Sequence, residues 1–118
     1  MKKIYHLGTC STCQRILKEW EVDETFELQD IKNERMTATQ VDQMIEMAGS
    51  AAKLFSKRAM KYRAMGLHER ELSEKEMRQL ILDEYTFLSR PVFIFGDIIF
   101  IGNSKKVVAA AKEKLQEV

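Results

Sequence analysis

The chain has 118 residues, with 19 Lys and Arg against 18 Asp and Glu and a formal net charge of +1. A chain of this length buries roughly two-thirds of the surface that it exposes when unfolded, so it can fold as one domain without a disulfide or a metal ion. The balanced charge argues against a direct nucleic-acid partner or a membrane-surface protein. No run approaches the roughly 20 apolar residues of a membrane-spanning helix.

The N-terminal third predicts a strand, a helix and a second strand. Residues 3–7 form a short run typical of a strand. A helix is expected to follow, with Ser11 as its N-cap and Cys10 at or just before its start. Residues 25–31 alternate in character and predict the second strand. In the segment between these strands, the apolar residues that recur at helical spacing are Ile16, Leu17 and Trp20.

The middle of the chain, about residues 35–88, carries only helical signals. Gly49 is expected to end the first of these helices, and a short helix is expected through Leu54 and Phe55. Two capping-box patterns predict where the longer helices begin. These pairs are Thr37 with Gln40 and Ser73 with Glu76. We therefore expect an all-helical insert between the second and third strands.

The C-terminal part predicts a hairpin and a last helix. The apolar runs 92–95 and 98–101 are joined by Gly96 and Asp97, which is the signal of a two-residue hairpin turn. Ser104 is expected to cap the helix, whose apolar face comprises Val107, Val108, Ala111 and Leu115. The order strand, helix, strand, helical insert, hairpin and helix predicts a single α/β domain over residues 1–118.

Both cysteines, Cys10 and Cys13, lie in a CxxC motif between the first strand and the first helix. Backbone N–H groups and the helix dipole stabilise an anion at a helix N-terminus, so a thiol there loses its proton more easily. Cys10 is the better placed nucleophile. Cys13 is one helical turn further on and can resolve a mixed disulfide. A CxxC beside a β-α pattern indicates a thioredoxin-like redox motif.

Three other interpretations of the cysteine pair remain open. A zinc site needs four ligands, and the chain offers only the two cysteines, His6 and His68. A structural disulfide is unusual in a reducing compartment. Two inert, buried cysteines are the third alternative. We expect that compartment to be the cytoplasm, because the N-terminus lacks the apolar stretch and cleavage site of a signal peptide.

The single proline of the chain, Pro91, directly precedes the third predicted strand. In thioredoxin-like folds a cis-proline at this place faces the CxxC motif. An ordinary trans-proline at the start of an edge strand is the alternative. We expect Arg90, which directly precedes this proline, to be a site residue.

The whole chain resembles the ArsC/Spx branch of the thioredoxin-like superfamily. The resemblance is carried by YHLGTCSTCQRIL near the start, the helical middle with MKYRAMGL, and LSRPVFIFG near the end. It implies a thioredoxin-like core, namely a mixed four-stranded sheet with flanking helices, interrupted by the helical insert at about residues 35–88.

The resemblance to arsenate reductases of this family implies an enzymatic mechanism. In those enzymes one cysteine attacks arsenate, arginines hold the oxyanion, and glutathione with glutaredoxin completes the reduction. Cys10 matches the nucleophile, and His6 matches a histidine near the thiol. Arg90 matches one oxyanion arginine and Arg58 is the candidate for a second. A third, expected near the last strand, is absent from FIGNSKK. No bound cofactor is expected, and glutathione, glutaredoxin or thioredoxin would be the thiol donor.

The resemblance to Spx-like regulators implies a different function. These proteins use their CxxC as a redox switch and bind the C-terminal domain of the RNA polymerase α subunit. The CSTC motif is closer to that pattern than to the single-cysteine enzymes, whereas Spx proteins usually have a longer basic tail than the KEKLQEV end of this chain. A domain that has kept the fold and lost its chemistry is a third hypothesis.

Several residues around the thiol are expected to support it. If His6 shares a strand face with Ile4, a protonated imidazole could favour the thiolate; a hydrogen-bonded strand histidine without such a role is the alternative. The backbone N–H groups of Thr9, Ser11 and Thr12 could form an anion-binding nest. Farther along, a basic stripe at helical spacing is expected either to face solvent or to steer anions. Its members are Lys53, Lys57 and Lys61.

Overall fold

The computed structural model describes residues 2–116, which divide into two compact units. The sheet unit comprises Met1–Arg35 and Arg90–Val118, and the helical unit comprises Met36–Ser89. The sheet unit is therefore built from two stretches that the helical unit separates in the sequence. The assignment of the whole chain to one domain stays a prediction. Within residues 2–116, no helix has the length and apolar character that crossing a membrane requires.

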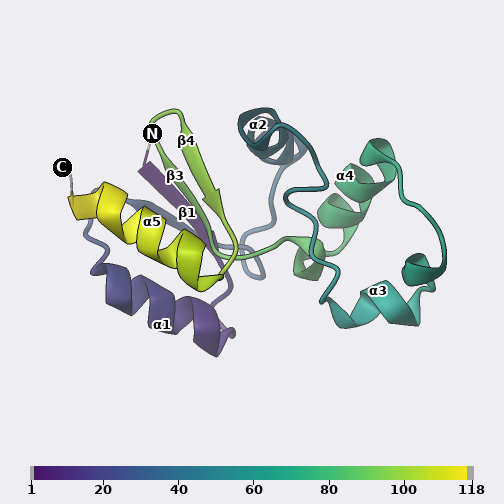
Figure 1. Cartoon of the computed structure of the whole chain (residues 1–118), viewed down its shortest axis with the longest axis horizontal. Coiled ribbons are helices and arrows are strands. Elements are labelled where there is room, and N and C mark those ends of the chain that lie inside the picture. Colours follow the sequence, from purple (N-terminus) through teal and green to yellow (C-terminus); the bar gives the residue numbers. More distant parts are fainter. Residues whose placement is uncertain (1, 117–118) are drawn as a thin grey trace. The chain divides into compact units, whose positions relative to one another are not determined.

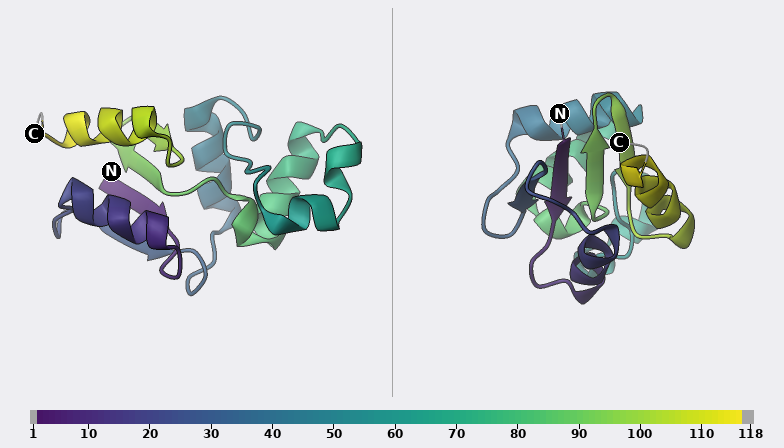
Figure 2. Two further views of the ribbon diagram at one scale, coloured as in Figure 1. Left: turned by 60° about the horizontal axis from the view of Figure 1, so that its bottom comes forward. Right: turned by 90° about the vertical axis from the view of Figure 1, so that its left-hand side faces the viewer.

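The sheet unit contains a mixed four-stranded sheet with the strand order β2-β1-β3-β4 (Figures 1 and 2). Its strands are β1 (Lys2–His6), β2 (Glu27–Asp30), β3 (Val92–Phe95) and β4 (Ile98–Ile101). β1 pairs in parallel with β2 and antiparallel with β3, which pairs antiparallel with β4. The predicted hairpin is confirmed, and Gly96 in its turn has a φ of 62°, which favours glycine.

Two helices, α1 (Ser11–Trp20) and α5 (Lys105–Gln116), pack against one face of this sheet and lie side by side (Figure 1). Their shared core includes Ile4 of β1, Phe93 of β3 and Val108 of α5. Trp20 links the two helices, because its indole Nε1–H donates a hydrogen bond of 3.1 Å to the carbonyl oxygen of Val108. The predicted cap of α5 is confirmed, since the Ser104 hydroxyl accepts the Val107 N–H at 3.2 Å.

The second strand differs from its prediction. β2 is shorter than residues 25–31, and Leu28, on the same strand face as the buried Phe26, is 48% exposed. The buried side chain in this strand is Gln29, whose amide Nε2 donates to the carbonyl oxygen of Glu34 at 3.0 Å. β2 is an edge strand, so its apolar positions have neighbours on one side only, and a hydrogen-bonded amide can take the buried position.

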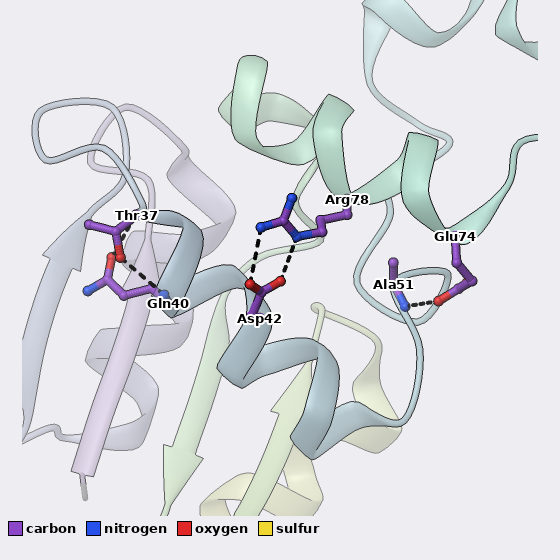
Figure 3. A network of polar contacts seen from close by, with 6 residues as sticks. All are labelled: Thr37, Gln40, Asp42, Ala51, Glu74 and Arg78. Atoms are coloured by element: carbon purple, nitrogen blue, oxygen red, sulfur yellow. Dashed lines mark hydrogen bonds and ion pairs between the residues drawn. The ribbon is translucent and has the colours of Figure 1, made fainter.

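The helical unit contains α2 (Ala38–Ala48), α3 (Met60–Ala64) and α4 (Glu74–Asp83), with short 3-10 helices at Leu67–Glu69 and Tyr85–Phe87. Both predicted capping boxes are confirmed. Gly49 ends α2 as expected, with a φ of 97°. The capping box of α2 is visible in Figure 3, where Thr37 and Gln40 exchange hydrogen bonds.

Polar contacts hold α2 and α4 together within the helical unit (Figure 3). Arg78 of α4 donates two hydrogen bonds to the carboxylate of Asp42 in α2, at 2.6 and 3.1 Å. The carboxylate of Glu74, in the first turn of α4, accepts the backbone N–H groups of Ala51 and Ala52. These bonds fix the turn that follows α2.

The expected helix through Leu54 and Phe55 is wrong. Phe55 forms an isolated antiparallel bridge with Leu88, and the Ser89 N–H donates to the carbonyl oxygen of Leu54 at 2.7 Å. The N–H groups of Leu54 and Phe55 both donate to the carbonyl oxygen of Ala51 at 3.0 Å, which closes a single turn. The long-range bond from Ser89 takes the Leu54 carbonyl, and the turn does not continue as a helix. The expected helical spacing of the basic stripe is also wrong, because Lys53 lies in a turn outside any helix.

Candidate active site

The thiol loop, residues 7–10, connects β1 to α1 and presents Cys10 at the helix start. The Cys10 N–H donates to the carbonyl oxygen of Leu7 at 3.0 Å, and the carbonyl oxygen of Cys10 accepts the Gln14 N–H at 3.1 Å. Cys10 is itself the N-cap, with φ −91° and ψ 111°. The prediction of Ser11 as N-cap is therefore wrong by one residue. Cys10 has the extended backbone, and its carbonyl accepts the first helical bond.

The environment of Cys10 favours its thiolate. Partial burial raises the pKa of the Cys10 thiol, but hydrogen bonds from the backbone N–H and thiol of Cys13 oppose burial. The positive charge of Arg90 and the backbone N–H of Thr12 lower the pKa further. The net result is a pKa below the ordinary cysteine value, which is the property of a nucleophilic thiol at a helix N-terminus.

Cys13 has the opposite character. Its side chain is buried, and burial is the main reason why the pKa of Cys13 rises from 9.0 to about 11. The hydrogen bond that it donates to Cys10 and the charge of the Cys10 thiolate act in the same direction. The backbone N–H of Leu7 and the charge of Arg90 oppose the rise without cancelling it. Both cysteines are free, so the pair is a dithiol in which the Cys13 thiol donates a hydrogen bond to the Cys10 sulfur.

Arg90 and Pro91 adjoin the thiols from the start of β3. The Arg90–Pro91 peptide bond is cis, as expected. Pro91 is buried and Arg90 is partly buried. Arg90 lowers the pKa of both Cys10 and Cys13 through its charge, so its guanidinium is part of the electrostatic environment of the pair. Its role in holding a substrate stays a prediction.

His6 lies at the end of β1 on the same strand face as Ile4. Burial lowers the pKa of its imidazole, and the nearby Asp30 carboxylate opposes this only in part. This direction disfavours the imidazolium form, and a role of His6 in favouring the thiolate stays a prediction. The Gln14 amide Nε2 lies 3.4 Å from His6 Nδ1 and donates to the carbonyl oxygen of Leu7 at 3.2 Å. This arrangement matches the alternative of a hydrogen-bonded strand histidine.

Of the three backbone N–H groups expected to form an anion nest, that of Thr12 donates to the Cys10 sulfur. The backbone N–H groups of Thr12 and Cys13 both donate to Cys10. The side chain of Ser11 is exposed. The helix start therefore stabilises the Cys10 thiolate, and binding of an external oxyanion by the same groups stays a prediction.

Arg58 belongs to the helical unit and is exposed ahead of α3. Its backbone N–H donates to the Ser56 hydroxyl at 3.3 Å. The structure therefore brings together Cys10, Cys13 and Arg90 within the sheet unit. The role of Arg58 as a second oxyanion arginine stays a prediction.

Two further residues adjoin the thiol loop and were not expected from the sequence. Gln14 contacts Leu7 and His6, and Asp30 accepts a hydrogen bond from the backbone N–H of Gly8. A signal for Asp30 was available, because it ends the strand that follows β1. The C-terminal ends of adjacent parallel strands meet at one edge of a sheet, where sites of α/β proteins form.

The model of the ArsC family matches residues 5–111 of the chain. No curated protein matches the chain significantly. Across residues 2–116, no three His, Cys, Asp or Glu side chains are grouped in a way that could hold a metal ion.

Solved structures resemble the chain over almost its full length. SACOL0876 from Staphylococcus aureus COL is 28% identical, with 93% of this chain and 97% of that chain covered and a TM-score of 0.71. A possible arsenate reductase from Streptococcus mutans UA159 is 26% identical, with 89% and 92% covered and a TM-score of 0.68. The arsenate reductase from Vibrio cholerae is 15% identical, with 99% and 96% covered and a TM-score of 0.72, a likeness that concerns the fold alone. Together they confirm the predicted thioredoxin-like α/β fold.

Proposed function

The chain belongs to the ArsC family, and from that premise we propose that it is a thiol oxidoreductase of the arsenate-reductase type with Cys10 as its nucleophile. The observation that carries this proposal is the asymmetry of the cysteine pair. The pKa of Cys10 is lowered, whereas burial raises the pKa of Cys13 to about 11. One sulfur is thus set up to attack, and its neighbour retains its proton.

The first step is attack by the Cys10 thiolate on an oxidised substrate. With a disulfide substrate, a bond forms between the Cys10 sulfur and one substrate sulfur, and the other substrate sulfur leaves as a thiolate. With an arsenate-like oxyanion, Cys10 bonds to the central atom and displaces a hydroxide. Arg90 stabilises the negative charge that develops on the substrate in either case, and a planar guanidinium suits a tetrahedral oxyanion.

The second step resolves the adduct. Cys13 loses its proton and attacks the Cys10 sulfur, which forms the Cys10–Cys13 disulfide. The substrate leaves with two more electrons than it brought. A thiol donor such as glutathione, glutaredoxin or thioredoxin then reduces the disulfide and is itself oxidised. An external thiol that attacks Cys10 directly achieves the same electron balance without Cys13.

The test measures Cys10 alkylation by iodoacetamide as a function of pH, with the modified residue identified by mass spectrometry. We expect an apparent pKa below the free-cysteine value of about 8.5. Reduction of arsenate and of glutathione mixed disulfides is then assayed for wild type, Cys10→Ser and Cys13→Ser. Loss of turnover in Cys10→Ser is the expected result. Full activity of Cys10→Ser together with loss in Cys13→Ser would sink the assignment of the nucleophile.

A second candidate function is that of an Spx-like regulator with the Cys10–Cys13 pair as its switch. It is supported by the hydrogen bond between the two side chains, because two cysteines in contact are the starting point for a disulfide. The partner would be the C-terminal domain of the RNA polymerase α subunit, and the location would be the cytoplasm. A pull-down with that domain, using reduced and oxidised protein, tests this function. Absence of binding by both forms would rule it out.

A further inference from the structure

Asp30 lies beside the thiol loop at the C-terminal end of β2. In the parallel pairing of β1 with β2, Asp30 is in register with His6, the last residue of β1. The Ile31 N–H donates to the carbonyl oxygen of His6 at 2.9 Å, so this register continues to the point where the thiol loop begins. The pairing therefore places the Asp30 carboxylate next to the loop that leads to Cys10.

Three donors hold the Asp30 carboxylate in place. The Lys32 N–H donates to Oδ1 at 3.1 Å, and the Asn33 side-chain amide donates to Oδ2 at 3.1 Å. The third donor is the backbone N–H of Gly8, two residues before Cys10. The first two donors come from the segment after β2, whereas the third comes from the thiol loop. Asp30 thus connects the loop to a fixed part of the sheet unit.

Gly8 approaches this carboxylate so closely that a side chain at position 8 would displace either the carboxylate or the loop. A Cβ atom built on Gly8 would overlap the Oδ2 atom of Asp30. Displacement of the carboxylate would break or distort the hydrogen bonds from its three donors. Gly8 is not among the residues with positive φ, so backbone conformation does not account for glycine here. The close approach to the Asp30 carboxylate instead favours glycine at position 8.

From this contact we propose that Asp30 is a positioning residue for the Cys10 nucleophile, acting through the backbone of Gly8. The inference rests on the proposed function of Cys10. The loop is short, and the Cys10 N–H is bonded to the carbonyl oxygen of Leu7, so a shift at Gly8 is transmitted to the N-cap. The N–H groups of Thr12 and Cys13 stabilise the thiolate only while the Cys10 sulfur stays in front of them.

The test compares Asp30→Ala with Asp30→Asn by the pH profile of Cys10 alkylation. Asp30→Ala removes the acceptor of the Gly8 N–H, and we expect the alkylation rate at pH 7 to fall roughly threefold to tenfold as the profile moves to higher pH. Asp30→Asn keeps an oxygen that accepts the same N–H, and it should restore most of the rate. Asp23→Ala is the matched control. It removes an exposed carboxylate that accepts the N–H of Thr25 and does not contact the thiol loop.

A double substitution tests the steric part of the proposal. Gly8→Ala should slow alkylation by itself, because its Cβ displaces either the loop or the carboxylate. In the Asp30→Ala background, Gly8→Ala should slow alkylation little further, since the Oδ2 atom that the new Cβ would overlap is absent. Independent, additive effects of the two substitutions would overturn the proposed contact.

The outcomes also separate this proposal from the proposed function. An ordinary Cys10 pKa in the wild-type protein would reject the proposed function. A lowered wild-type pKa with an unchanged profile in Asp30→Ala would reject only the positioning role, whatever happens to thermal stability. A purely structural role for Asp30 predicts a lower melting temperature for Asp30→Ala with an unchanged pH profile of Cys10 alkylation. Failure of Asp30→Asn to recover the alkylation rate would also contradict the positioning role.

Discussion

At the scale of single residues, the decisive feature is the unequal pair formed by Cys10 and Cys13. Cys10, the N-cap of α1, is partly exposed, whereas Cys13, in the first turn of that helix, is buried. Tertiary packing causes this difference, because helix geometry alone places side chains three residues apart on one face. The same turn directs the Cys13 thiol toward the Cys10 sulfur.

Arg90 provides the first prediction at this scale. Because its charge lowers the pKa of Cys10, Arg90→Ala should raise that pKa and slow iodoacetamide alkylation at pH 7 by roughly threefold to tenfold. Arg90→Lys keeps the charge and should have the smaller effect on alkylation. It should lose more in turnover of an oxyanion, which needs the planar fork. Equal alkylation profiles for wild type and Arg90→Ala would show that the charge of Arg90 does not lower the pKa of Cys10.

Cys13 provides a second prediction, which concerns stability and pH. The pKa of Cys13 is about 11 in the folded protein and 9.0 for a cysteine without such burial. Between these two pH values the folded state therefore retains a proton that the unfolded state loses. Stability from this group is complete below pH 9 and is lost as the pH rises toward 11. The loss amounts to roughly 2 to 3 kcal/mol.

Urea unfolding at pH 8 and pH 10.5, with reductant present, measures this loss. Wild type should lose more unfolding free energy between these two pH values than Cys13→Ala, which has no proton to lose. Tyr5, whose pKa burial raises to about 12, contributes a similar loss at higher pH in both proteins and therefore cancels from the comparison. Identical pH dependence in the two proteins would contradict the prediction.

At the scale of elements, capping boxes account for the beginnings of α2 and α4. The hydroxyl of Thr37 accepts the Gln40 N–H at 3.1 Å, and the Gln40 side chain accepts the Thr37 N–H at 3.0 Å. Each bond joins groups three residues apart, so the sequence contains the complete motif. The same holds for Ser73 and Glu76 at the start of α4.

We expect Thr37→Ala to reduce the free energy of unfolding by about 1 kcal/mol, because it leaves the N–H of Gln40 without its acceptor. Urea denaturation at pH 7 measures the change. Thr39→Ala, an exposed threonine inside α2, is the control. It should be neutral or slightly stabilising, since alanine has the higher helix propensity. A Thr39→Ala loss as large as that of Thr37→Ala would mean that capping is not the cause.

At the scale of the whole molecule, burial against the sheet determines the importance of an apolar side chain. Ile16 of α1 is 1% exposed in the core between helix and sheet, whereas Leu28 of β2 is 48% exposed. We expect Ile16→Ala to cost about 2 to 5 kcal/mol of unfolding free energy. Leu28→Ala should change it by less than about 0.5 kcal/mol. Denaturation monitored by fluorescence of Trp20, the only tryptophan, distinguishes the two results.

The sequence by itself determined those features that depend on near neighbours. The capping boxes, the Gly49 stop, the hairpin turn and the CxxC at a helix start each rest on groups a few residues apart. Their hydrogen bonds and backbone angles are therefore specified locally. The strand and helix order followed from periodicity, and it was enough to predict the fold class.

Only the tertiary structure decided features that join distant residues. The turn at Leu54 and Phe55 pairs with the segment around Leu88 and does not continue as a helix. Local spacing cannot reveal this, because the partner backbone lies more than 30 residues away. The Asp30 carboxylate reaches the Gly8 N–H because β1 and β2 pair in a particular register. The opposite pKa changes of the two cysteines likewise depend on burial and on the charge of Arg90. A pattern of local spacing specifies which groups are available, whereas packing specifies which of them meet and how deeply each is buried.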